Sequence, residues 1–125
     1  HWLDLGAKLK AAGAKLPAIY CVNWFRKGDD GKFVWPGYGE NMRVLKWMLE
    51  RVEGRAGGEA HGFGITPRYG DLNWDGLDFT PAQFERVTSL DAADWQRELA
   101  LHGELFTLLA HHLPAELKAA RERLG

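Results

Sequence analysis

The sequence is poor in cysteine, and it has no long hydrophobic run in its 125 residues. The only cysteine, Cys21, cannot form an internal disulfide, and one thiol excludes a zinc site built from cysteines. No run of 18 apolar residues occurs, so we expect no segment to span a membrane. No basic-then-apolar leader is present either, and a signal peptide is therefore not expected.

Net charge is also nearly absent, at −1 for the whole chain. This balance gives no general attraction to nucleic acid, and we expect no nucleic-acid partner. The charge is uneven, because residues 1–55 are basic on balance and residues 56–125 are acidic. A basic first half favours an anionic ligand, although many ordinary protein surfaces show the same asymmetry.

The composition is that of a folded chain, with 46% hydrophobic and 26% charged residues. Such a chain has enough apolar side chains to order itself, which excludes disorder along its whole length. Its length fits one small domain or a piece of a larger one. The first residues, from His1, resemble the middle of an amphipathic helix, so we expect a piece of a longer protein.

Periodic apolar residues predict several helices. Residues 41–53 carry apolar side chains at helical spacing, and so do residues 92–113, where the stripe runs from Trp95 to Leu113 with His102 in a gap. Thr80, followed by Pro81, is a typical helix start, and Pro114 begins a last helix. The fold class predicted is a helix-rich α+β mixture.

A small β-hairpin is predicted near residues 18–35. Residues 18–25 form an apolar run rich in β-formers and are interpreted as a buried strand, in which Cys21 would be inert. A polar turn follows, and then a short second strand at 33–35. Residues 54–80 are rich in glycine and are expected to be irregular.

Two other patterns suggest metal or proton chemistry only weakly. Residues 71–76 match the start of a calcium loop, but Ala82 stands where the bidentate glutamate is needed, so a turn that caps its own backbone is the better interpretation. His111 and His112 are adjacent and point about 100° apart on a helix, so they cannot chelate one ion. No metal site is predicted in this chain.

Aromatic residues gather beside a glycine turn, and this cluster is the main candidate site. Phe25 ends one predicted strand, Phe33 begins the next, and Tyr38 lies in the turn before Asn41, where a helix begins. Flat rings can stack on a planar heteroaromatic ligand, and the free N–H groups of a helix start can donate to its edge. From the residues alone, a base-binding site and a simple core hairpin both remain open.

The run of residues around this cluster resembles the GTP-dependent phosphoenolpyruvate carboxykinases. The resemblance rests on VNWFRK at 22–27, a short polar turn, and WPGYGEN at 35–41 leading into a helix. Residues 15–19, 67–69 and 71–77 and the closing helices are also similar, so the resemblance covers nearly the whole chain. It implies that residues 1–125 are one C-terminal segment of the family's larger α/β nucleotide-binding domain, in a cytoplasmic enzyme.

The family makes phosphoenolpyruvate, CO2 and GDP from oxaloacetate and GTP, and its guanine lies in an aromatic pocket. By resemblance, Phe25, Phe33 and Tyr38 would form the walls, with Trp24 adjoining, and Asn41 would hold the base edge. Gly39 and Glu40 would form the approach. Tyr38 replaces the usual phenylalanine, and Met42 stands where the family often has a small polar residue; we expect neither to abolish binding of GTP or GDP.

The phosphate and metal groups of the family are not recognisable here. No G-x-x-x-x-G-K-[ST] loop occurs, and the resemblance places the ligands for Mn²⁺ or Mg²⁺, the phosphate loop and the substrate arginines upstream. We therefore expect the guanine pocket at about 18–53, an irregular loop at 54–80, a helical end at 81–125, and no catalytic residue. The missing upstream part would be the segment's partner.

The rival hypothesis is that the chain is a non-catalytic helical interaction module. Its partner surface would be the stripe from Trp95 to Leu113, and its aromatic hairpin would be only core.

Overall fold

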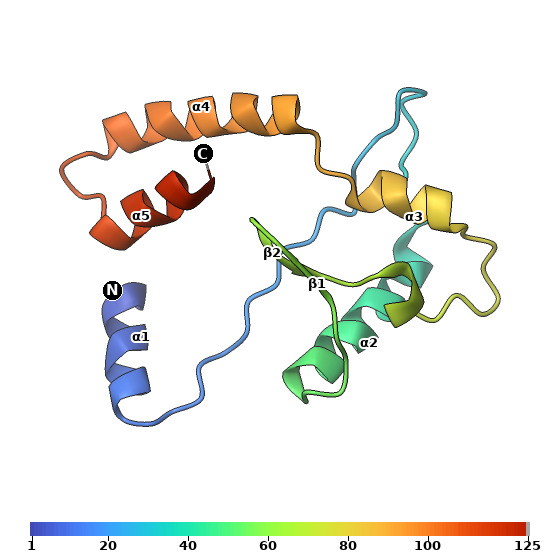
Figure 1. Cartoon of the computed structure of the whole chain (residues 1–125), viewed down its shortest axis with the longest axis horizontal. Coiled ribbons are helices and arrows are strands. Elements are labelled where there is room, and N and C mark those ends of the chain that lie inside the picture. The colour runs from blue at the N-terminus through green and yellow to red at the C-terminus, as the bar shows by residue number, and fades with distance from the viewer. Residues whose placement is uncertain (125) are drawn as a thin grey trace.

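The structure is a computed structural model that describes residues 1–124, and it is rich in helix (Figure 1). The helix-rich mixed fold is confirmed. One small antiparallel sheet accompanies the helices. The elements are α1 (Trp2–Ala11), the 3-10 turn Tyr38–Glu40, α2 (Asn41–Val52), β1 (Glu59–His61), β2 (Gly64–Thr66), the 3-10 turn Tyr69–Asp71, α3 (Pro81–Thr88), α4 (Ala92–Leu108) and α5 (Ala115–Leu124).

The helices begin where the sequence predicts. The Thr80 side chain accepts from the backbone N–H of Gln83 at the start of α3, and the Gln83 side chain accepts from the N–H of Thr80 in return. The Asp91 side chain caps α4 by accepting from the N–H of Asp94 at 2.8 Å. α2 covers the predicted residues 41–53 to within one residue, and α5 follows Pro114.

The sheet lies elsewhere than predicted. β1 and β2 pair antiparallel, with Glu59 opposite Thr66, inside the stretch that was expected to be irregular. The predicted hairpin at 18–35 contains a single bridge, between Lys27 and Phe33, and residues 18–25 form no strand. Cys21 is exposed, so its predicted burial was also wrong. A strand requires a neighbouring backbone to pair with, and no described segment lies in that position.

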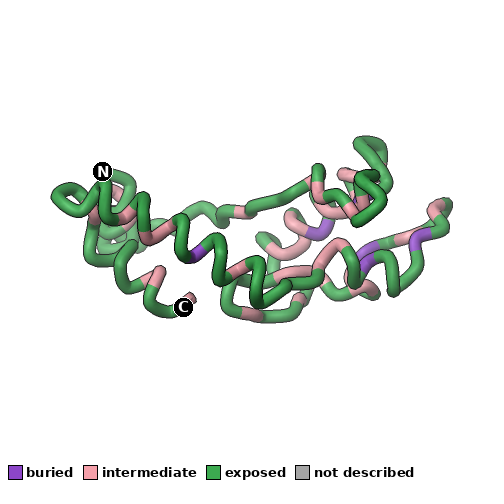
Figure 2. Tube along the Cα trace, turned by 90° about the horizontal axis from the view of Figure 1, so that it is seen from above, coloured by how far each residue is buried: buried purple, intermediate pink, exposed green. Residues whose placement is uncertain are grey.

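The core lies between α2, α3 and the loop that joins β2 to α3. Trp47 is only 2% exposed, and its indole N–H donates to the carbonyl of Gly57 at 3.1 Å. Leu72, Phe79 and Phe84 are buried around it, and Figure 2 shows how few buried positions the trace holds. This core holds the loop from β2 to α3 and the start of α2 in place.

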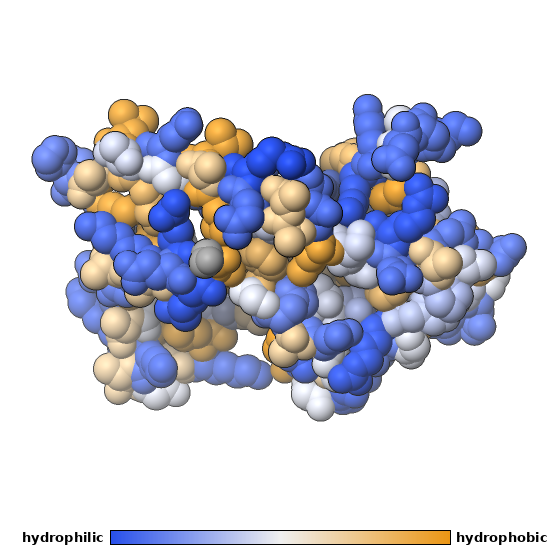
Figure 3. All heavy atoms as spheres, turned by 45° about the horizontal axis from the view of Figure 1, so that its top comes forward, coloured by the Kyte–Doolittle hydropathy of each residue, from blue (hydrophilic) through white to orange (hydrophobic). Residues whose placement is uncertain are grey.

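The last two helices, α4 and α5, pack against each other. α4 lies above α5 in Figure 1, and a guanidinium nitrogen of Arg121 on α5 donates to the carbonyl of Leu99 on α4 at 3.1 Å. The Arg121 guanidinium also lies over the Phe106 ring. Other hydrophobic side chains of α4, among them Leu101, Leu105 and Leu108, are exposed. Figure 3 shows that hydrophobic patches reach the surface on this face of the molecule. Within residues 1–124, no helix combines the length and the hydropathy needed to cross a bilayer.

Candidate functional site

The turn between residues 26 and 33 positions the aromatic cluster. Its backbone is closed by two hydrogen bonds beside the Lys27–Phe33 bridge: Gly28 N–H donates to Lys32 and Val34 N–H donates to Arg26. Because side chains alternate between two faces in extended backbone, neighbouring residues beside this turn point to opposite sides of it.

Phe25 and Phe33 contact one another on the outer face of this turn, which is the face exposed to solvent. Their ring centroids are 5.8 Å apart in an edge-to-face arrangement, and the two residues are 72% and 56% exposed. The Lys27 ammonium lies 5.7 Å from the centre of the Phe33 ring. A hairpin that served only as core would bury these rings, whereas here they present open aromatic surface beside a cation.

Trp24 lies on the inner side, away from the phenylalanine pair. It packs at 5.5 Å against Trp35, which is buried and in turn contacts Trp74 and Phe79. The sequence places Trp24 beside Phe25, but the structure uses its ring to close the edge of the core. Trp24 therefore supports the turn rather than forming a wall of the exposed aromatic face.

The glycine turn presents Tyr38 to solvent. Gly37 has φ of 134°, a conformation that strains any residue with a Cβ, and it leads directly into the 3-10 turn at Tyr38–Glu40. Tyr38 is 91% exposed and makes no ring contact with another aromatic residue within residues 1–124. The structure thus exposes Tyr38 and Gly39, but it does not bring Tyr38 against the phenylalanine pair.

Asn41 and Glu40 are held by neighbours at the start of α2. The side-chain oxygen of Asn41 accepts from the Trp35 indole N–H at 2.8 Å, which leaves its NH2 group free to donate. Glu40 pairs with the Arg43 guanidinium at 2.6 Å. Arg43 also donates to the carbonyls of Asn73 and Asp75, so the helix start is anchored to the loop at 71–76.

The two basic residues of the turn have different positions, which the sequence alone did not separate. Arg26 points inward and donates to the carbonyls of Val87 and Ser89, at 3.1 and 2.8 Å. Lys27 points outward over Phe33. The sequence did contain a signal that separates them. Side chains alternate between two faces in extended backbone, which places Lys27 on the same exposed face as Phe25 and Arg26 on the opposite face.

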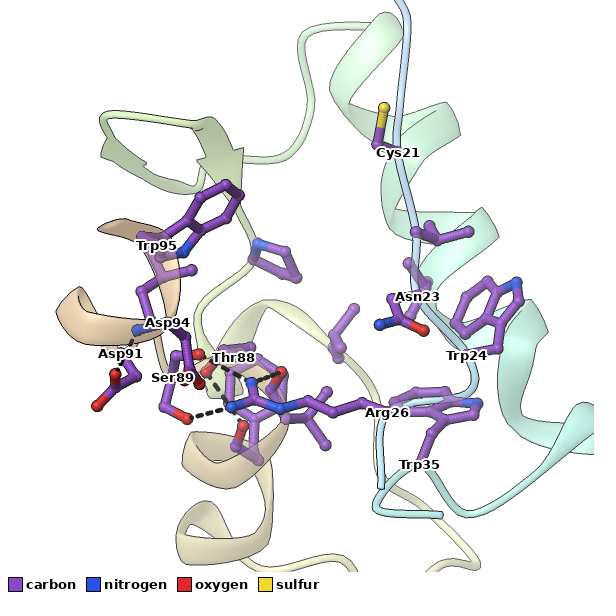
Figure 4. Close-up of a pocket in the computed structure, with 17 residues that line it drawn as sticks. Cys21, Asn23, Trp24, Arg26, Trp35, Thr88, Ser89, Asp91, Asp94 and Trp95 are labelled. Carbon is purple, nitrogen blue, oxygen red and sulfur yellow. Dashed lines mark hydrogen bonds between the residues drawn. The ribbon is translucent and has the colours of Figure 1, made fainter. Parts of the chain in front are cut away.

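A hollow of about 450 Å³ lies on the inner side of the extended segment, between residues 21–26 and the start of α4 (Figure 4). Of the candidate residues, only Trp24 lines it, so the hollow is separate from the Phe25–Phe33 face. We call it the inner groove. Its other lining residues include Leu90 and Trp95.

Within residues 1–124, no cluster of three or more histidine, cysteine, aspartate or glutamate side chains could hold a metal ion. The calcium-like loop closes on itself, because the Asn73 side chain accepts from the N–H of Asp75 and donates to its carboxylate. The interpretation of residues 71–76 as a self-capping turn is confirmed. A divalent metal does not fit the residues described here.

Comparison with known proteins gives the family. Residues 1–125 match the family model described as the phosphoenolpyruvate carboxykinase C-terminal P-loop domain. The chain is 44% identical over 117 residues to phosphoenolpyruvate carboxykinase (GTP) of Corynebacterium jeikeium, covering 94% of this chain and 19% of that protein. It is 44% identical over 124 residues to the same-named protein of Anaeromyxobacter dehalogenans strain 2CP-C, covering 99% and 20%.

The chain therefore belongs to the GTP-dependent phosphoenolpyruvate carboxykinase family, within its C-terminal P-loop domain. It spans about a fifth of the length of the curated relatives it matches. The resemblance stated from VNWFRK and WPGYGEN is confirmed at the level of the family.

Proposed function

We propose that this chain is the guanine-binding part of a phosphoenolpyruvate carboxykinase that converts oxaloacetate and GTP to phosphoenolpyruvate, CO2 and GDP. The reaction would serve gluconeogenesis in the cytoplasm, and its chemical class is that of a decarboxylating lyase. The observation that carries the proposal is the open face of Phe25 and Phe33, beside Lys27, in a chain of this family.

This face suits a guanine base. An exposed ring can stack on one side of a planar base, worth about 1–3 kcal/mol by analogy with base stacking in single strands. Because the two rings touch each other, a base that inserts between them must first separate them. Neither residue is tied to the buried core cluster, so such a movement leaves that cluster intact.

The polar contacts of the base would come from the glycine turn. Asn41 keeps its NH2 donors while Trp35 fixes its oxygen, so the group is oriented before a ligand arrives. An NH2 donor can recognise an acceptor atom such as the carbonyl oxygen of guanine. Gly39 has no atom near the position that a Cβ would occupy, which leaves the backbone open to a ligand, and Glu40 is held aside by Arg43.

The phosphate and metal chemistry would lie in the rest of the full-length protein. Phosphoryl transfer requires cations positioned on the transferred phosphate, and a divalent ion such as Mn²⁺ or Mg²⁺ would supply that charge. The described residues hold no fitting ligand cluster, and we assign no catalytic residue to residues 1–125.

A titration of the full-length protein with GTP and ATP tests the proposal. We expect GTP to bind more tightly than ATP, and Phe33→Ala and Tyr38→Ala each to weaken GTP binding by about 1–3 kcal/mol, through loss of a stacking face. Trp2→Ala is the control, because it removes an exposed aromatic ring from α1, outside the candidate site. Unchanged GTP affinity in both site variants, measured by calorimetry, would refute the pocket.

The 125-residue chain alone should make no phosphoenolpyruvate from oxaloacetate, GTP and Mn²⁺. Stacking can hold a base, but it does not neutralise charge that develops on a phosphate. A coupled assay of the purified chain measures this directly. Turnover above a no-protein control, in a preparation free of full-length enzyme, would show that catalytic groups lie within residues 1–125.

The rival hypothesis of a helical interaction module is less well supported. Its proposed partner surface, the stripe from Trp95 to Leu113, is largely occupied within the chain. Leu99 is buried, Phe106 lies under Arg121, and Trp95 stacks on Phe63 at 3.7 Å. A module that docks by this stripe would first have to displace α5 and the β1–β2 turn.

A further inference from the structure

The loop at residues 71–76 has a defined shape that is fixed from two directions. Asn73 closes it locally, because its side chain accepts from the N–H of Asp75 at 2.6 Å and donates to the Asp75 carboxylate at 3.0 Å. The Trp74 indole N–H donates to the Tyr69 carbonyl at 2.9 Å, which ties the middle of the loop to the residues before it. The backbone carbonyls of Asn73 and Asp75 are therefore held in fixed positions.

The Arg43 guanidinium on α2 donates to both of these carbonyls and to the Glu40 carboxylate. All three of its nitrogens are used: Nε contacts Glu40 at 2.6 Å, one terminal nitrogen contacts Asn73, and the other contacts Asp75 at 3.0 Å. The Arg43 side chain is only 18% exposed, whereas that of Arg55, just after α2, is 61% exposed. A planar fork of donors suits such converging acceptors, and shielding from water strengthens each contact.

A second link joins the same part of the chain to the residue that follows Glu40. The Trp35 ring is buried and contacts Trp74 and Phe79 edge-to-face. Its indole N–H donates to the side-chain oxygen of Asn41 at 2.8 Å. Two adjacent polar residues at the start of α2 are thus held by two different side chains, and both of these rest on the loop before α3.

We propose that Arg43 is a positioning residue for the proposed guanine site, and that the loop at 71–76 determines where its guanidinium lies. By occupying the Glu40 carboxylate, the guanidinium leaves the NH2 donors of Asn41 available to the base. A carboxylate only accepts hydrogen bonds, so a released Glu40 would compete with the base for those donors. The positioning role rests on the proposed function, since it requires that a guanine base meets the turn at 37–41.

Calorimetry of the full-length protein with GDP and with ADP tests this role. The two ligands carry the same ribose and phosphates, so the ratio of their affinities reports contacts with the base. Arg43→Met should reduce the preference for GDP by about 3–10-fold, the equivalent of roughly one hydrogen bond. Arg55→Met is the matched control and should keep the preference within about twofold, because it removes an arginine from an exposed ion pair.

Asn73→Ala is a second variant that leaves Arg43 in place, and it decides the matter if Arg43→Met fails to fold. Without the Asn73 side chain the loop loses both local hydrogen bonds to Asp75, so the two carbonyls should no longer converge on the guanidinium. We expect a smaller loss of GDP preference in the same direction. Unfolding midpoints of the same samples distinguish a purely structural arginine, whose loss would lower the midpoint and leave the ratio of affinities unchanged.

The wild-type ratio separates the positioning role from the proposed function. Equal affinity for GDP and ADP in the wild type would refute the guanine site, and the role of Arg43 with it. A wild-type preference for GDP that persists in both Arg43→Met and Asn73→Ala would refute only the positioning role. A preference lost in Arg43→Met but kept in Asn73→Ala would refute the part assigned to the loop.

Discussion

α2 and the extended segment at 15–24 are both rich in apolar residues, but the rest of the chain covers only α2 well enough to bury a side chain. α2 buries Trp47 and contacts the β1–β2 hairpin and the loop before α3. The extended segment has no buried residue. A helix satisfies its own backbone hydrogen bonds and needs only side-chain cover, whereas a strand also needs a neighbouring backbone.

The aromatic residues divide in the same way. Trp24 and Trp35 face inward and join the edge of the core, while Phe25 and Phe33 face solvent. Burial explains the first pair without any ligand. The second pair leaves apolar rings in water, and the proposed guanine site would account for that exposure.

The largest loss of stability is expected for Trp47, the buried residue of α2. Trp47→Ala should lower the free energy of unfolding by about 3–5 kcal/mol, because it leaves a cavity and removes the hydrogen bond to Gly57. Trp2→Ala, at an exposed position, should change it by about 0.5 kcal/mol or less. Urea denaturation of the chain measures both, and equal effects would contradict the assigned core.

A smaller effect should come from Gly58, where the hairpin contacts α2. A Cβ at this residue would lie 2.6 Å from Ile65 Cγ2 and 3.2 Å from the Trp47 ring, so Gly58→Ala should cost about 1–3 kcal/mol by overpacking. Gly57→Ala is the matched control, since nothing lies near its Cβ position. Denaturation midpoints that shift equally for the two variants would show that the hairpin does not pack on α2 in this way.

The smallest effect concerns Arg26, which links the turn at 26–33 to the C-terminal end of α3. Arg26→Met should destabilise the chain by about 1–2 kcal/mol, through loss of its charged hydrogen bonds to the carbonyls of Val87 and Ser89. Lys27→Met should be nearly neutral, because its ammonium lies only over an exposed ring. Thermal unfolding compares the pair, and a larger loss for the Lys27 variant would reverse the assigned roles.

Local signals in the sequence predicted where the helices begin, but the apolar spacing over residues 92–113 runs past the end of α4, which lies at Leu108. Thr80 with Gln83, and the apolar spacing of residues 41–53, depend only on neighbours within a few residues. The hairpin at 59–66 was missed because strands of three residues are too short to show alternation. The strand predicted at 18–25 failed for a different reason: its local preference is clear, but a strand also needs a neighbouring backbone, and no described segment supplies one.

The candidate site was predicted in part. Phe25 and Phe33 do meet, and Asn41 does begin a helix, because adjacent turns fix both. Trp24 was included by position, and its packing on Trp35 could not be seen without the fold. The guanine assignment of Phe25, Phe33, Tyr38, Gly39, Glu40 and Asn41 stays a prediction.

Photolabelling of the full-length protein with 8-azido-GTP tests the central claim most directly. The azide reports the position of the base itself, so the label should fall within residues 24–41, should be lost with excess GTP, and should drop in Phe33→Ala. The Trp2→Ala variant should label like the wild type. A GTP-protected label confined to peptides outside residues 24–41 would contradict the proposed guanine site.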